Sequence, residues 1–205
     1  MMHRCYPIVD LDFNGSRQAV RLAGELGEAG CSMIEVRAKN SSGEQYYQYT
    51  RQVIDAAGEN CRVVVNDRLD VALASGAAGV HLGGNDIPVV EARRIAGDVF
   101  IIGATAREPS GAKAAELDGA NYLGVGAVFP TAHKDDTRLI GLEGLASVTR
   151  EVTSPVFAIA GITEENCTQP IQAGAWGVSC IGAVAGAAAP ADTWLAMEKA
   201  MKQAK

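Results

Sequence analysis

The sequence has few of the features that mark nucleic-acid-binding or membrane proteins. Its net charge is -6, it has no run of lysine and arginine, and only 5% of its 205 residues are aromatic. It therefore lacks the basic surface and the stacking rings of a nucleic-acid-binding protein. No uncharged apolar run approaches the roughly 18 residues of a membrane span, and the first residues do not have the pattern of an export signal. These absences predict a cytoplasmic protein that binds neither nucleic acid nor membrane.

Cysteine spacing gives no sign of a metal centre or a disulfide framework. The cysteines are scattered, without a Cys-x-x-Cys pair, and most lie in or beside apolar runs. This placement predicts buried free thiols. The residues concerned are Cys5, Cys31, Cys61, Cys167 and Cys180.

What the sequence does contain is a regular alternation of short apolar strands and amphipathic helices. Strands are expected at residues 3–10, 33–39, 62–66, 79–82, 99–106, 121–129, 155–161 and 176–184, with helices between them and at the C-terminus. The strand and helix pairs recur about every 25 residues, near the lower limit for a (β/α)8 barrel. We therefore predict an α/β protein, a single (β/α)8 TIM barrel that occupies residues 1–205 as one domain.

Polar side chains gather where the third and fourth predicted strands end. Asn66 is the last of residues 62–66, Asp67 comes directly after it, and Asp86 follows the next strand. Parallel neighbouring strands present these side chains at the same end of a barrel, where active sites of this fold lie. Two carboxylates and an amide suit Mg²⁺, which leaves its remaining positions to water and substrate phosphates. Turn and helix-cap roles for Asn66 and Asp67 are the alternative. His81, in the fourth strand, is expected to be a core residue that bonds to backbone.

Three charged residues share one face of the second predicted strand, because side chains of a strand alternate with period two. They are Glu35, Arg37 and Lys39. Charges that face a barrel interior need a ligand or one another, so we expect either an anion site or a mutually neutralising cluster.

Further polar groups and glycines are expected at the same rim. Thr105 ends the fifth strand, and Thr131 and Lys134 belong to residues 130–140, the longest irregular segment, which predicts a mobile active-site loop. Backbone amides near Gly161 and Gly182, after strands seven and eight, occupy the usual phosphate-binding place of such barrels. A metal-bound diphosphate and a second phosphate in one barrel indicate a transfer reaction.

Four segments resemble thiamine phosphate synthase, and the resemblance runs over nearly the whole chain. They are RVVVNDRLDVALASGAAGVHLGGND at 62–86, LGVGAVFPTAHK at 123–134, GLEGL at 141–145 and AIAGIT at 158–163. The resemblance implies a Mg²⁺-dependent transferase of thiamine biosynthesis. Enzymes of that family join hydroxymethylpyrimidine diphosphate to thiazole phosphate and release diphosphate.

The resemblance also implies roles for individual residues. Arg37, Lys39, Asn66 and Lys134 would hold the diphosphate, and Asp67 and Asp86 would bind Mg²⁺. Thr105 would lie near the pyrimidine and the leaving group, and Thr131, Gly161 and Ile181 would hold the thiazole phosphate. Lys134, Arg37, Lys39 and Thr105 are the expected catalytic residues, and His133 and Gly182 complete the expected substrate-binding set.

Several positions depart from the family pattern, so retained and altered activity are both open. Glu35 and Gly84 replace glutamines, His133 a threonine, Ala160 a glycine and Gly182 a serine. One alternative is a thiazole tautomerase, which typically lacks both aspartates; another is a paralogue that binds thiazole or thiamine phosphate without turnover. A third is a Schiff-base aldolase acting on a phosphorylated keto acid, with Glu35 as base and Lys39 or Lys134 as nucleophile. Assembly into a homo-oligomer is also left open.

Overall fold

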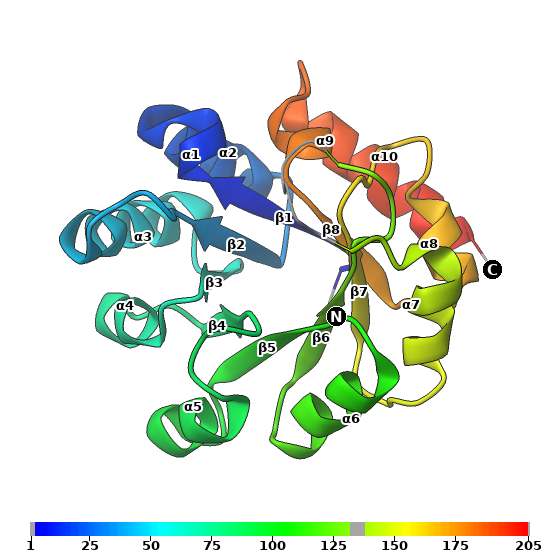
Figure 1. Ribbon diagram of the computed structural model, residues 1–205. Coiled ribbons are helices and arrows are strands. Elements are labelled where there is room, and N and C mark those ends of the chain that lie inside the picture. Colours follow the sequence, from blue (N-terminus) through cyan, green and yellow to red (C-terminus); the bar gives the residue numbers. More distant parts are fainter. Residues whose placement is uncertain (1–2, 132–137, 205) are drawn as a thin grey trace.

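Parallel strands β1 to β8 pair in sequence order and close into a barrel in the computed structural model, which describes residues 3–131 and 138–204 (Figure 1). The strands are β1 (Cys5–Asp10), β2 (Met33–Arg37), β3 (Arg62–Asn66), β4 (Gly79–Leu82), β5 (Ile101–Ala106), β6 (Tyr122–Val125), β7 (Val156–Ile159) and β8 (Gly177–Cys180). Pairing of β8 with β1, with Cys5 opposite Val178, closes the ring. The predicted (β/α)8 barrel is confirmed.

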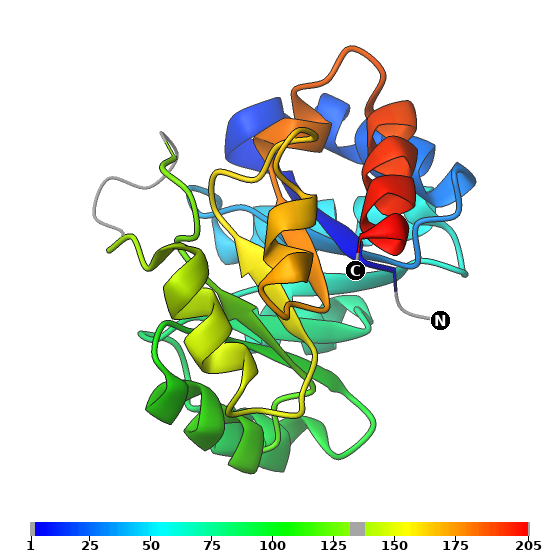
Figure 2. The same cartoon turned by 90° about the vertical axis from the view of Figure 1, so that its right-hand side faces the viewer.

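The helices form a ring outside the strands (Figure 1). They are α1 (Leu11–Asn14), α2 (Ser16–Glu28), α3 (Gly43–Ala57), α4 (Leu69–Ser75), α5 (Val89–Ala96), α6 (Pro109–Leu117), α7 (Gly141–Thr149), α8 (Thr168–Gln172), α9 (Gly182–Ala185) and α10 (Pro190–Gln203). The C-terminal helix α10 packs against α2 and β1 (Figure 2). Two of its side chains fix the start of β1: Glu198 Oε1 accepts from the amide of Cys5 at 2.6 Å, and Trp194 Nε1 donates to its carbonyl at 3.0 Å.

Apolar side chains fill two separate layers. The larger layer lies between the strands and the helices. The smaller lies inside the barrel and contains three aromatic rings, Tyr6, Tyr122 and Phe157, in edge-to-face contact with centroids 4.8 to 5.7 Å apart. Edge-to-face packing is a favourable arrangement for aromatic rings. We call Tyr6, Tyr122 and Phe157 the aromatic floor, because they fill the barrel interior below the polar residues of the cavity.

Some element boundaries differ from the prediction. Residues 176–184 were expected as one strand but form β8 and then the short helix α9, because a short apolar run does not distinguish a strand from a buried helical turn. The second strand ends at Arg37 rather than at residue 39. The amide of Lys39 instead donates to Asp12 Oδ2 at 3.0 Å, so the chain leaves the β ladder.

Two other predictions are tested directly. All five cysteines are buried free thiols, as predicted. Within residues 3–131 and 138–204, no helix is both long and apolar enough to cross a membrane.

Candidate active site

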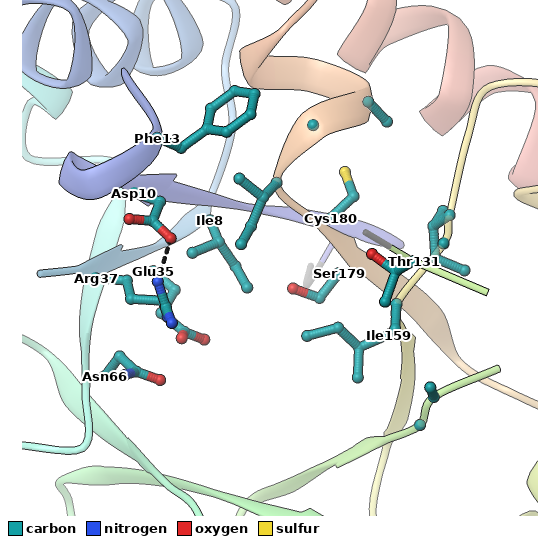
Figure 3. Close-up of a pocket in the computed structure, with 18 of the residues that line it drawn as sticks. Ile8, Asp10, Phe13, Glu35, Arg37, Asn66, Thr131, Ile159, Ser179 and Cys180 are labelled. Carbon is teal, nitrogen blue, oxygen red and sulfur yellow. Dashed lines mark hydrogen bonds and ion pairs between the residues drawn. The ribbon is translucent and has the colours of Figure 1, made fainter. Parts of the chain in front are cut away.

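A cavity of about 570 Å³ lies at the C-terminal end of the barrel strands. Figure 3 shows Asp10, Glu35, Arg37 and Asn66 on one side of it, with Ser179, Ile159 and Thr131 facing them. The predicted site residues that line it are Arg37, Asn66, Thr105, Thr131, Gly161, Ile181 and Gly182. His133 and Lys134, and with them most of the expected loop, lie outside the described residues.

Asp67 and Asp86 bring their carboxylates together beside Gly83. A Cβ atom placed on Gly83 would lie 3.1 Å from Asp86 Oδ2 and 3.9 Å from Asp67 Oδ1. The amide of Gly83 donates to Asp86 Oδ2 at 2.7 Å. Asp67 has a φ of 66°, in the left-handed region, and its amide donates to the carbonyl of His81 at 2.8 Å. The hydrogen bond from Asp67 to His81 joins the end of β3 to β4, and the two carboxylates converge beside it.

Asp67 does not cap the following helix. The N-cap of α4 is Arg68, and no side chain caps that end. The Asp67 carboxylate is directed instead to Lys39, with Nζ and Oδ2 3.2 Å apart. A left-handed non-glycine residue carries backbone strain, and such residues concentrate at functional sites.

The electrostatics of the carboxylate pair favour a cation. Burial raises the pKa of Asp86, and the adjacent charge of Asp67 raises it further, against the lowering effect of the Gly83 amide. Among residues 3–131 and 138–204 no three His, Cys, Asp or Glu side chains are grouped to hold a metal ion. Asp67 and Asp86 would offer two carboxylates to a cation, a number that fits Mg²⁺, because Mg²⁺ takes one or two carboxylates and completes its shell with water and substrate phosphate.

Arg37 forms its ion pair with Asp10, whose side chain is only 4% exposed. The β1–β2 register places the two residues directly opposite each other, whereas Glu35 lies opposite Ile8. Lys39 pairs with Asp67. Of the two alternatives for Glu35, Arg37 and Lys39, the mutually neutralising cluster is therefore not what pairs the two cations, because each has a carboxylate partner outside the second strand.

Glu35 is 2% exposed and lines the cavity above the aromatic floor. Burial, and after it the charge of Glu35, raise the pKa of Tyr6 well above its ordinary value. Asn66 is held by Tyr46 of α3, whose hydroxyl lies 2.7 Å from the carbonyl oxygen of Val36 and 3.0 Å from that of Asn66 and shares its one proton between them. The backbone N–H of Asn66 donates to that hydroxyl at 3.1 Å, which leaves the side-chain amide of Asn66 out of this contact. One tyrosine thus fixes the ends of β2 and β3.

Thr105 presents its hydroxyl to the cavity and to His81. Its Oγ1 lies 3.0 Å from Nε2 of the ring, and Nδ1 lies 3.1 Å from the hydroxyl of Tyr122. Both ring nitrogens therefore contact side chains, and the expectation of backbone partners for His81 was wrong.

The segments after β7 and β8 form the opposite wall. Gly161 has a φ of 65°, and a Cβ there would lie 2.5 Å from the carbonyl oxygen of Pro130. Asn166 Nδ2 donates to the Gly161 carbonyl at 2.9 Å and holds the turn. Ala160, at φ 78°, adopts a conformation that favours glycine, the family residue at this position. Gly84 has open space where its Cβ would be, so a residue with a side chain could stand there without a clash at that atom.

Some cavity residues were not predicted. Asp10, Asp12 and Phe13 come from the end of β1 and α1, Arg107 follows Thr105 by two positions, and Ser179 comes from β8. The only sequence signal was the position of Asp10 as the last residue of an apolar run. Its role depends on the pairing register, which periodicity does not define.

Comparison with known proteins agrees with this geometry. The family model described as thiamine monophosphate synthase matches residues 5–184. The chain belongs to the thiamine monophosphate synthase family. It is 42% identical over 177 residues to the thiamine-phosphate synthase of Chlorobium limicola, covering 85% of this chain and 84% of that protein. The thiamine-phosphate synthase of Pyrococcus furiosus is 40% identical over 185 residues, covering 90% and 87%.

Solved structures place the family within a wider set of barrels. The thiamine phosphate pyrophosphorylase of Pyrococcus furiosus matches 98% of this chain and 96% of its own, with a TM-score of 0.88 and 35% identity. A 3-hexulose-6-phosphate synthase matches with a TM-score of 0.72 but 18% identity over 97% and 99% of the chains, a likeness of fold alone. The first match supports the thiamine monophosphate synthase family; the second shows how widely the barrel itself is shared.

Proposed function

We propose that this member of the thiamine monophosphate synthase family is a transferase of thiamine biosynthesis. It would join hydroxymethylpyrimidine diphosphate to thiazole phosphate and release diphosphate. The observation that carries the proposal is the convergence of Asp67 and Asp86 at Gly83, beside a cavity that Arg37 and Asn66 line. This arrangement suits a diphosphate better than a single phosphate, because it combines a cation site with a separate guanidinium.

The diphosphate half of the site lies at the ends of β2, β3 and β4. Asp67 and Asp86 would hold Mg²⁺, which supplies Lewis-acid stabilisation of the leaving group when bound. Lys39, paired with Asp67, and Arg37, paired with Asp10, present cations to the same side. Asn66 would donate its amide to a diphosphate oxygen. Lys134 keeps its predicted role in diphosphate binding from the family resemblance.

The thiazole phosphate half would lie at the ends of β7 and β8. Thr131, Gly161, Ile181 and Gly182 line this wall, and backbone amides after these two strands are the usual phosphate-binding groups of the fold. Ile8 and Ile159 supply apolar surface between the two halves. The cavity volume lies within the roughly 300–1,000 Å³ of small-molecule sites, so two small rings would fit.

The test is product formation from the two substrates with Mg²⁺, measured as thiamine phosphate and diphosphate in equal amounts. A metal-free reaction is the control. Turnover of thiazole carboxylate phosphate without diphosphate release would instead indicate a tautomerase, which typically lacks both aspartates. Borohydride trapping of a substrate on lysine would indicate the aldolase, and binding of thiamine phosphate without turnover would indicate the binding paralogue.

One domain over residues 1–205 and a cytoplasmic location stay predictions from the sequence. Assembly into a homo-oligomer also stays open to measurement.

A further inference from the structure

Arg107 is an exposed cation on the wall of the cavity. It comes directly after β5, two residues beyond Thr105, and both side chains line the cavity. Thr105 is half-buried, whereas Arg107 is exposed. Because the cavity opens at the C-terminal ends of the strands, the residue farther along the chain lies nearer the mouth. Arg107 therefore presents a guanidinium at the entrance of the cavity, on the β5 side.

Arg107 differs from Arg37 and Lys39 in having no carboxylate partner. Those two cations form the ion pairs described above. Glu108, the carboxylate next to Arg107 in the chain, lies 3.0 Å from the guanidinium of Arg138 instead. Within residues 3–131 and 138–204, the Arg107 side chain has no hydrogen bond and no ion pair. Its guanidinium can therefore meet an anion without first breaking a contact with the described part of the chain.

The charged groups that line the cavity explain why an unpaired cation matters. Three carboxyl groups line it, those of Asp10, Asp12 and Glu35, against the two guanidiniums of Arg37 and Arg107. Asp10 offsets the charge of Arg37. Arg107 is thus the one guanidinium of the described lining that is left to neutralise a substrate. A phosphorylated substrate would enter against the carboxyl groups, and a cation at the mouth attracts it.

The position of β5 in the ring indicates which substrate Arg107 would meet. β5 pairs with β4 on one side and with β6 on the other. Asp86, one of the two converging carboxylates, follows β4. The wall that would hold thiazole phosphate lies at β7 and β8, and β6 separates it from β5. Arg107 thus stands beside the diphosphate half of the site.

We propose that Arg107 is a further substrate-binding residue, whose guanidinium binds the terminal phosphate of the pyrimidine diphosphate. The terminal phosphate is the group farthest from the pyrimidine ring, so it lies nearest the mouth when the ring is inside the barrel. A guanidinium can bind two phosphate oxygens at once in a fixed geometry, which an ammonium group does not match. The identity of the ligand rests on the proposed function.

The first test measures binding without turnover. Isothermal titration of the full chain with inorganic diphosphate and Mg²⁺ gives the dissociation constant, which we expect to rise about 10-fold in Arg107→Gln. This is the lower end of the effect for a hydrogen bond to a charged group, because the side chain is exposed. Arg107→Lys keeps the charge and should recover part of the affinity. An unchanged dissociation constant in Arg107→Gln would overturn the proposal.

A matched variant separates a local contact from a general loss of positive charge. Arg94 is an exposed arginine of α5 that pairs with Glu91 and does not line the cavity. Arg94→Gln removes the same charge and should leave diphosphate binding unchanged. Arg107→Gln should also unfold at the same urea concentration as the unmodified protein, because it removes no contact between described residues. Equal weakening of diphosphate binding by the two variants would contradict the proposal.

Turnover identifies the substrate that Arg107 binds. In Arg107→Gln we expect KM for the pyrimidine diphosphate to rise about 10-fold, while KM for thiazole phosphate stays the same. A rise for thiazole phosphate alone would overturn the proposal. If the unmodified protein binds magnesium diphosphate but forms no thiamine phosphate, the proposed function fails, and the comparison of Arg107→Gln with Arg94→Gln still decides the role of Arg107. No binding of magnesium diphosphate by the unmodified protein would overturn both.

Discussion

Asp10 lies directly opposite Arg37 across the β1–β2 pairing, and the two side chains form a buried ion pair on the wall of the cavity. Asp10 Oδ1 also accepts from the amide of Asp12 at 2.9 Å, so the carboxylate is fixed at both oxygens. The pair keeps Arg37 in place beside the cavity before any anion binds.

Removing Asp10 should therefore cost stability. We expect Asp10→Ala to lower the free energy of unfolding by about 3 kcal/mol, because it leaves a largely buried guanidinium without its carboxylate. Asp70→Ala, which removes the partner of Arg68 from an exposed pair, is the matched control and should cost less than about 1 kcal/mol. Urea unfolding measures both; equal losses would contradict a buried ion pair at Asp10.

Gly161 offers a test of the wall after β7. Gly161→Ala should destabilise the fold by about 1–2 kcal/mol from its left-handed φ alone, and by more from the clash with the Pro130 carbonyl. Gly141→Ala is the control, since Gly141 has a φ of 66° but open space at its Cβ. Thermal unfolding of the two variants separates strain from clash. A Gly161→Ala variant no less stable than Gly141→Ala would show that the backbone at Pro130 moves to accommodate the added methyl group.

Glu116 predicts a pH dependence of stability. Its Oε1 accepts from the amides of Thr153 and Ser154 at 2.7 Å each, and Lys113 pairs with Oε2 at 2.9 Å. The ion pair with Lys113, and then these amides, lower the pKa of Glu116 well below its ordinary value of 4.5. Because the pKa falls on folding, this contribution is fully present above pH 4.5 and is lost as the pH drops toward the folded-state pKa.

The corresponding measurement compares Glu116→Gln with the unmodified protein in urea at neutral pH and below pH 4. The unmodified protein should be more stable at neutral pH, and the difference should shrink in acid. Glu91→Gln, in an exposed pair with Arg94, should show little difference at either pH. An equal difference in stability at both pH values would mean that the charge of Glu116 does not stabilise the contact between α6 and the segment before β7.

Sequence periodicity was enough to predict the barrel and the rim positions of Asn66, Asp67 and Asp86, because Asn66 ends a buried strand and the two aspartates follow buried strands. It did not predict the partner of Arg37, because that depends on the register between β1 and β2. The contact between His81 and Tyr122 was missed for the same reason: Gly103 lets a ring cross from β6 to β4, and only the register shows it.

The most direct test of the account is single-turnover formation of thiamine phosphate with and without Mg²⁺, in the unmodified protein and in Asp67→Asn. Asparagine tolerates the left-handed backbone of this position, so the fold is retained while the charge is removed. We expect metal-dependent product that falls about 100-fold or more in Asp67→Asn and is unchanged in Asp70→Asn. Equal rates with and without Mg²⁺, or an unimpaired Asp67→Asn, would contradict the assignment of the carboxylate pair.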